Sequence, residues 1–198
     1  MGEFQNTGQP DWDWWGKLWP TPGETLRSLG VSEGDSVVEV GSGNGYFALP
    51  AARVVEPAPV YAVELDRELL EEAARLADMK GIGNLVTVHA DVTSLSDHLP
   101  KSVDVALVAN ILHGVGDEVG FAREVRGALS SDGKLVVVNW RDAPMEETTI
   151  LDEPRGPPTE LRMSPVETEE GIKEAGFEVV RSVELPPYHY ATVFAPSQ

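Results

Sequence analysis

The sequence has 198 residues, of which 41% are hydrophobic, so it can form one well-buried domain but is short for two. Its 33 acidic residues against 15 basic ones give a formal charge of -18, which repels phosphate backbones and argues against a nucleic-acid substrate. Since the chain has no apolar run long enough to cross a membrane and an acidic rather than basic N-terminus, we expect a cytoplasmic protein without a membrane partner.

The chain contains no cysteine, which excludes disulfides, thiolate metal sites and mechanisms that use a cysteine nucleophile. No metal ligand is assigned from the sequence. Two explanations of the acidic composition stay open. One is an ordinary glutamate-rich solvated surface, and the other is halophilic adaptation to a high-salt cytoplasm that screens the repulsion between like charges.

Residues 1–30 predict a polar tail and a tryptophan-rich helical attachment, and residues 31–198 predict the main domain. Four of the five tryptophans lie between Trp12 and Trp19. Because a tryptophan buries a large area, this segment dominates whatever surface it joins. It either packs against the core or a partner subunit, or forms a lid over a binding cleft with Trp15 and Trp19 as contacts. Residues 21–30 have the composition of a short helix that ends at Gly30.

The stretch from residue 35 to residue 50 organises the rest of the prediction. Residues 36–40 form a short β-branched run typical of a buried strand, and Gly41, Gly43 and Gly45 follow it at alternate positions. Glycine permits the positive φ needed at such a turn and lets a ligand approach the main chain. A helix is predicted over residues 46–55, and its first amide groups favour polar or anionic groups. The stretch therefore predicts a loop that binds a nucleotide-type cofactor.

Strands and helices alternate in the middle of the chain. Apolar runs predict strands at residues 60–63, 85–89, 103–109 and 135–140, with a turn at Gly133 before the last of them. Apolar residues at helical spacing predict helices over residues 67–79 and 117–129. This alternation implies right-handed βαβ units and a parallel sheet covered on both sides.

The C-terminal part begins with an acidic, proline-rich loop over residues 141–163, where such folds carry substrate determinants. Ser164 and Glu167 form a capping box that starts a helix, and Gly176 ends it. The β runs at residues 177–183 and 188–194 are too close together for a parallel crossover, so they predict an antiparallel hairpin. The expected fold is α/β and Rossmann-like, with a seven-stranded, mostly parallel sheet, helices on both faces and a C-terminal antiparallel β-hairpin.

The glycine stretch, Val-Glu-Val-Gly-Ser-Gly-Asn-Gly, resembles motif I of the class I S-adenosylmethionine (SAM)-dependent methyltransferases. A dinucleotide-binding loop would instead need a third glycine where this chain has Tyr46. The terminal hairpin also fits the seven-stranded methyltransferase arrangement. Asn-Ile-Leu-His at residues 110–113 and Pro-Pro-Tyr-His-Tyr at residues 186–190 are similar to the small-molecule, ubiquinone-biosynthesis-like branch. The resemblance covers roughly residues 30–195.

The resemblance implies SAM as the cofactor, bound beyond the carboxyl ends of successive strands. Glu64 has the spacing from the first glycine at which a carboxylate accepts hydrogen bonds from a ribose diol. Asp91, with the amide of Val92, matches the position that reads the adenine, and Asn110 matches the one that meets the methionine part. Asp66 is assigned to capping the next helix. The full set of cofactor-binding candidates is Glu39, Gly41, Ser42, Gly43, Gly45, Tyr46, Glu64, Leu65, Asp91, Val92 and Asn110.

The catalytic candidates are His113 and His189. Methyl transfer is an in-line displacement in which the enzyme holds the nucleophile and excludes water, and a base is needed only when the acceptor loses a proton. Both histidines also have structural interpretations, His113 as a loop or helix cap and His189 as a packed strand residue. Tyr46 is a candidate donor to the cofactor carboxylate or to a substrate.

The predicted function is SAM-dependent methyl transfer to a small molecule, without a nucleic-acid partner. The alternative enzyme is a NAD-dependent oxidoreductase, which the spacing of the glycines and the terminal hairpin disfavour. A non-enzymatic alternative is a SAM-sensing or partner-binding protein with the tryptophan segment as its interface. The identity of the acceptor is left open, and so is the choice between a monomer and a homodimer.

Overall fold

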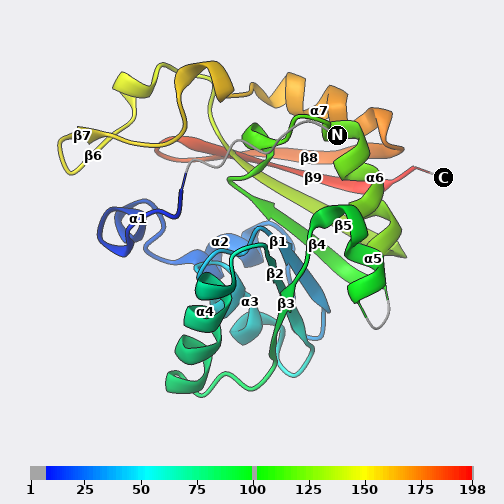
Figure 1. The fold of residues 1–198 in the computed structure, drawn as a ribbon. Coiled ribbons are helices and arrows are strands. Elements are labelled where there is room, and N and C mark those ends of the chain that lie inside the picture. The colour runs from blue at the N-terminus through cyan, green and yellow to red at the C-terminus, as the bar shows by residue number, and fades with distance from the viewer. Residues whose placement is uncertain (1–7, 100–101, 198) are drawn as a thin grey trace.

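The structure is a computed structural model that describes residues 8–99 and 102–197. It confirms the predicted fold, a seven-stranded sheet with helices on both faces (Figure 1). The strand order is β3-β2-β1-β4-β5-β9-β8; the first five of these run parallel, and the last two form the antiparallel C-terminal hairpin. The strands are β1 (Val37–Val40), β2 (Val60–Glu64), β3 (Leu85–His89), β4 (Val103–Ala109), β5 (Leu129–Trp140), β8 (Phe177–Leu185) and β9 (His189–Pro196).

Alternate side chains of the central strands point into two separate cores. Val105 and Leu107 of β4 pack on the face that carries α1, α2, α3 and part of α4, whereas Ala106 and Val108 pack on the face that carries α5, α6 and α7. The helices are α1 (Trp12–Leu18), α2 (Pro22–Ser28), α3 (Ala48–Val55), α4 (Arg67–Met79), α5 (Leu95–His98), α6 (Glu118–Ala128) and α7 (Pro165–Glu174). No helix in the described ranges is long and apolar enough to span a bilayer.

Short elements complete the chain and shape the loops beside the sheet. Within the predicted irregular loop, β6 and β7 form a small antiparallel pair close to α1 (Figure 1). These elements are η1 (Val92–Ser94), η2 (Leu112–Gly114), η3 (Met145–Glu147), β6 (Thr149–Ile150), β7 (Glu153–Pro154) and η4 (Thr159–Leu161).

Several predicted boundaries differ from those of the structure, and two of the differences have a clear cause in the backbone. The helix expected from Tyr46 begins at Ala48, because Gly45 has φ 88° and the next two residues continue the turn. The turn expected at Gly133 lies inside β5, which begins at Leu129. The strand bulges there, since the register with β4 shifts between Val103 and its next paired residue.

Two predicted caps are confirmed. Asp66 accepts hydrogen bonds from the main-chain N–H groups of Glu68 and Leu69 and so begins α4. Ser164 and Glu167 form the reciprocal bonds of a capping box at the start of α7.

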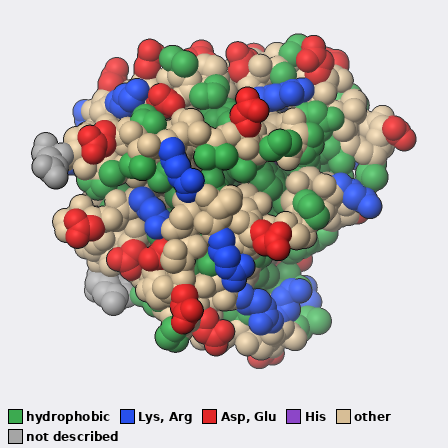
Figure 2. Space-filling view, turned by 180° about the vertical axis from the view of Figure 1, so that it is seen from behind, with side chains coloured by type: hydrophobic (Ala, Val, Ile, Leu, Met, Phe, Trp, Pro, Cys, Tyr) green, Lys and Arg blue, Asp and Glu red, His purple; other side chains and the backbone are tan. Residues whose placement is uncertain are grey.

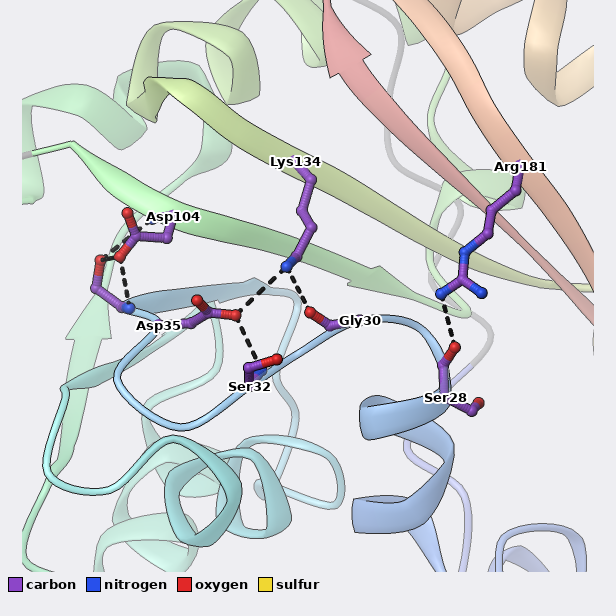
Figure 3. A network of polar contacts seen from close by, with 8 residues as sticks. Ser28, Gly30, Ser32, Asp35, Asp104, Lys134 and Arg181 are labelled. Carbon is purple, nitrogen blue, oxygen red and sulfur yellow. Dashed lines mark hydrogen bonds and ion pairs between the residues drawn. The ribbon is translucent and has the colours of Figure 1, made fainter.

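The segment that follows α2 is fastened to the sheet at the edge away from the glycine loop (Figure 3). Lys134 of β5 donates to the carbonyl of Gly30 and lies 3.4 Å from the carboxylate of Asp35. Arg181 of β8 donates to the carbonyl of Ser28 at 2.6 Å. Both side chains satisfy main-chain carbonyls near the end of a short helix, so the sheet fixes the position of α2.

Candidate functional site

A cavity of about 990 Å³ opens at the carboxyl ends of the parallel strands. It lies where β1 and β4 are neighbours and the strand order reverses, the place where open α/β sheets bind ligands. Most of the predicted site residues line it, whereas Gly45 and His189 are not among the lining residues. Those that do line it are Glu39, Gly41, Ser42, Gly43, Tyr46, Glu64, Leu65, Asp91, Val92, Asn110 and His113.

The glycine loop forms the floor of this cavity. Gly41 has φ 70°, and a Cβ at this position would lie 2.9 Å from the side chain of Ile111. Gly43 has φ 53° and packs against the side chain of Gln9 from the N-terminal segment. Both glycines therefore provide a left-handed backbone and a close approach, as the sequence predicted. Gly45 instead makes room for Leu49, so it serves the packing of α3.

Glu64 stands at the end of β2, beside the glycine loop. One carboxylate oxygen accepts from the N–H of Gly43 at 2.9 Å, and the other accepts from the N–H groups of Leu65 and Asp66 at 2.8 and 3.2 Å. These amides hold the carboxylate in a single orientation at the cavity wall. Carboxylate oxygens can accept more than one hydrogen bond each, so Glu64 can still accept bonds from a ligand.

Several polar atoms around the cavity are buried and lack a hydrogen-bond partner within the described chain. They include Oε2 of Glu39, Oγ of Ser42, and both amide atoms of Asn110. Buried polar groups are nearly always satisfied, so this set indicates that a polar ligand completes the site. Glu39 is only 2% exposed, and burial, followed by the charge of Glu64, raises the pKa of its carboxyl well above the usual value.

The end of β3 forms the next part of the wall. Asp91 accepts from the N–H of Thr93 at 2.8 Å and thereby starts η1. His89, which was not assigned from the sequence, also lines the cavity, and its Nε2 donates to the carbonyl of Leu65 at 2.9 Å. Its position at a strand end is the signal that could have identified it.

His113 lies on η2, just beyond β4, and lines both the main cavity and a smaller neighbouring one. Burial, with a smaller contribution from the charge of Arg162, lowers the pKa of the imidazole to about 4. The ring is therefore neutral near pH 7, and a pKa this far below the working pH makes it a weak base. Its role as a base stays a prediction.

His189 occupies a different environment from the one that a catalytic base requires. It is 5% exposed, and its ring lies 4.2 Å from that of Trp140 and 4.6 Å from that of Trp19. Burial lowers the pKa of its imidazole well below the usual value. We therefore correct its assignment from catalytic candidate to packed core residue, the structural alternative that the sequence left open.

Tyr46 lines the cavity with its ring, but its hydroxyl has another partner. The hydroxyl donates to the carbonyl of Trp19 at 2.9 Å, and the ring packs against Trp12 and Trp15. This bond fastens the glycine loop to the end of α1, and the expected hydrogen bond to a cofactor carboxylate or a substrate stays a prediction.

The outer wall of the cavity combines the N-terminal segment with the long loop after β5. Trp14 and Trp15 of α1 line it together with Trp140, at the end of β5, and residues 155–157. Trp19 instead packs beneath them against Phe47. The tryptophan segment therefore packs on the core and also walls the cavity. The sequence indicated the tryptophan segment and the loop over residues 141–163 as candidate walls, but it did not single out Trp14, Trp140 or residues 155–157, because nothing in local spacing indicates which loop residues meet.

This strand order, with a glycine loop after β1 and acidic groups at the ends of β1, β2 and β3, defines the class I SAM-dependent methyltransferases. The chain belongs to the methyltransferase-domain family, whose family model matches residues 31–171. The prediction of a SAM-dependent methyltransferase, rather than a NAD-dependent oxidoreductase, is confirmed at the level of the family, and SAM is the cofactor of this class.

Individual similarities are more distant. A ribosomal protein L11 methyltransferase from Exiguobacterium sp. is 36% identical over 85 residues, which are 43% of this chain and 26% of that protein. A ubiquinone/menaquinone biosynthesis C-methyltransferase from Bdellovibrio bacteriovorus is 26% identical over 115 residues, 58% of this chain and 48% of that protein. The chain thus spans between about a quarter and a half of the length of these relatives.

The fold matches that of a solved SAM-dependent methyltransferase from Aquifex aeolicus, with a TM-score of 0.75 and 23% identity over 88% of both chains. The relatives' names include a methyltransferase of a ribosomal protein and one of quinone biosynthesis. The predicted small-molecule branch is therefore not decided by similarity.

Proposed function

We propose that the chain binds SAM in the cavity at the carboxyl ends of its strands and transfers the methyl group to a small molecule. The observation that carries this proposal is the set of buried polar atoms of Glu39, Ser42 and Asn110 that have no partner in the described chain. SAM carries an ammonium, a carboxylate, a ribose diol and an adenine amine, so it supplies partners of the required kinds.

The polar groups divide naturally among the parts of SAM. Glu64, already oriented by amides, accepts hydrogen bonds from the ribose diol. Asp91 and the amide of Val92 read the adenine, while Glu39 and Asn110 meet the methionine part. When bound, SAM supplies an electrophilic methyl group on a sulfonium centre.

The protein's own contribution is to orient the acceptor and to exclude water. The indole rings of α1 and Trp140 enclose the outer part of the cavity, which limits competing hydrolysis. The strand ends fix the two reactants relative to each other, which lowers the entropic part of the barrier. His113 lies beside the cavity and takes a proton onto its imidazole when the acceptor must lose one, and its low pKa suits it best to an acceptor that is itself easily deprotonated.

A small acceptor is favoured over a macromolecule by the shape of the site. Residues of α1 and residues 155–157 line the outer wall of the cavity, which we assign to the acceptor. The net charge of -18 also opposes the approach of nucleic acid.

Four further predictions from the sequence stay proposals. They are a main domain over residues 31–198, a cytoplasmic location, a halophilic origin of the acidic composition, and a monomer or homodimer.

Transfer of isotopically labelled methyl from SAM, measured on a panel of small phenols, amines and acids and on intact ribosomal protein, tests the proposal. We expect label in at least one small molecule and none in the protein. Labelling of protein alone would overturn the small-molecule assignment. SAM binding without transfer to any acceptor would favour the sensing protein, and binding of NADH in place of SAM would favour the oxidoreductase.

A further inference from the structure

The outer wall of the cavity contains a cation among aromatic rings. Trp14, Trp15 and Trp140 supply the rings, and Arg155 supplies the charge. Among the described residues that line the cavity, the arginines are Arg155 and Arg67. Arg67 begins α4 beside the acidic end of β2, whereas Arg155 belongs to the opposite wall, which the long loop after β5 forms.

The backbone at Arg155 is firmly held. Its N–H donates to the carbonyl of Thr148 at 2.9 Å, and its carbonyl accepts from the hydroxyl of Thr148 at 2.8 Å and from the guanidinium of Arg162 at 3.0 Å. Arg162 is 7% exposed and also donates to the carbonyl of Pro157 at 3.0 Å. A buried arginine thus fixes the loop that presents Arg155, so the cation has a defined place in the wall.

The guanidinium of Arg155 is only partly satisfied by the protein. It stacks 5.3 Å from the centre of the Trp14 ring, and its Nη2 pairs with the carboxylate of Glu153 at 2.6 Å. The side chain of Glu153 is 67% exposed, and such surface pairs contribute little. Nε is buried and has no hydrogen-bond partner in the described part of the chain. A guanidinium has five N–H donors, so Arg155 keeps donors for an anionic ligand.

The positions of the acidic groups in the cavity indicate where an anionic acceptor can bind. Glu64, Asp66 and Asp91 lie on the side where β2 and β3 end, so an anionic acceptor is repelled there and attracted to Arg155. Arginine matches the planar geometry of a carboxylate, and indole walls suit the face or edge of a ring.

We infer that the methyl acceptor is a ring-bearing small molecule with a carboxylate, which Arg155 binds while the indoles of Trp14, Trp15 and Trp140 enclose the ring. This inference rests on the proposed function, because it concerns the acceptor side of the same cavity. Arg155 is a specificity-determining residue in this arrangement and takes no part in bond making.

Binding to the full chain saturated with S-adenosylhomocysteine tests the inference. The probes are hydroxybenzoate and hydroxynaphthoate, their neutral methyl esters and their amine analogues, measured by calorimetry and by quenching of tryptophan fluorescence. We expect at least one carboxylate to bind about tenfold or more tightly than its ester, the effect of a charge-assisted hydrogen bond. Equal or tighter binding of the esters or amines, or no binding of any carboxylate, would overturn the inference.

The variants Arg155→Met and Arg155→Lys assign the preference to this side chain. Arg155→Met should abolish the preference for carboxylates, whereas Arg155→Lys should keep part of it. Arg141→Met is the matched control, since Arg141 is an exposed arginine of the same loop that stacks on Tyr188 and does not line the cavity. A preference that persists in Arg155→Met would contradict the inference.

Affinity for S-adenosylhomocysteine separates the two levels of the proposal. If the wild-type chain fails to bind it, the proposed function fails. If it binds and the carboxylate preference is absent, only the inference about the acceptor fails. An unchanged affinity in Arg155→Met also shows that the variant keeps the folded cofactor side.

Discussion

The Glu64 carboxylate connects the glycine loop with the end of β2, and it is the group assigned to the ribose of SAM. Replacing Glu64 with alanine should raise the dissociation constant for SAM tenfold or more, since a hydrogen bond to a charged group contributes about 1.5–3 kcal/mol. Isothermal titration measures the change. Glu68→Ala, which removes a nearby exposed carboxylate of α4 that does not line the cavity, is the control. Equal affinities in the wild type and Glu64→Ala would refute the assignment.

His113 predicts a pH dependence of stability. Its pKa is about 4 in the folded chain and about 6.5 when unfolded, so the unfolded state binds more protons between these values. The free energy of unfolding should therefore fall as the pH is lowered from about 6.5 to about 4, by at most roughly 3 kcal/mol from this residue.

His113→Gln should lose this part of the pH dependence. Urea unfolding at a series of pH values, with the difference taken between wild type and variant, isolates the contribution of His113 from those of buried carboxyls. The exposed His98 provides the control, because His98→Gln should keep the wild-type slope. If the free energy of unfolding depends on pH in the same way in the wild type and in His113→Gln, the pKa of His113 is not lowered in the folded chain.

At the level of elements, the position of α2 depends on two long cationic side chains from the sheet. Replacing both Lys134 and Arg181 with methionine removes their bonds to the carbonyls of Gly30 and Ser28 (Figure 3). We expect amide hydrogen exchange of residues 22–31 to accelerate, with β4 unchanged, because local opening follows the loss of local contacts. Arg123→Met, on the exposed face of α6, should have no such effect. Unaltered exchange in residues 22–31 would mean that apolar packing alone holds α2.

The sequence predicted the central elements best, and the reason is physical. Runs rich in apolar and β-branched residues give β3 and β4 their observed bounds, and the apolar stripe together with the Asp66 cap identifies α4. The start of α3 and the bulge in β5 were missed, since the first depends on how the turn after Gly45 continues and the second on pairing with a neighbouring strand.

The residues of the candidate site also fall into those that the sequence could predict and those that it could not. Residues at strand ends, such as Glu64 and Asn110, were predictable because parallel strands end at one edge of the sheet. Arg155 and Trp14 come from segments far apart in the sequence, and only tertiary packing places the guanidinium on the indole. His189 was misassigned because a histidine between tyrosines looks alike in a strand and in a site, and burial decides between them.

At the scale of the whole molecule, the charge of -18 has a consequence for stability. On the face shown in Figure 2, acidic side chains are spread in separate groups with lysines and arginines between them. The excess negative charge therefore produces repulsion over long distances. Salt screens this repulsion, because the Debye length falls from about 10 Å at 0.1 M to about 3 Å at 1 M.

The melting temperature should accordingly rise as potassium chloride is increased across this range. Scanning calorimetry measures the shift, and sucrose at matched osmolality controls for effects other than screening. A melting temperature that stays constant or falls with salt would show that repulsion between like charges does not limit stability, and would remove the support for halophilic adaptation.

Every part of the proposed mechanism requires that the cavity at the strand ends holds SAM, with Glu64 on its sugar. A crystal structure of the chain with S-adenosylhomocysteine tests it most directly. We expect the nucleoside in the cavity, with the ribose hydroxyls donating to the Glu64 carboxylate and the buried polar atoms of Glu39 and Asn110 satisfied. A cavity filled by side chains, or a Glu64 side chain turned toward bulk water, would contradict the claim.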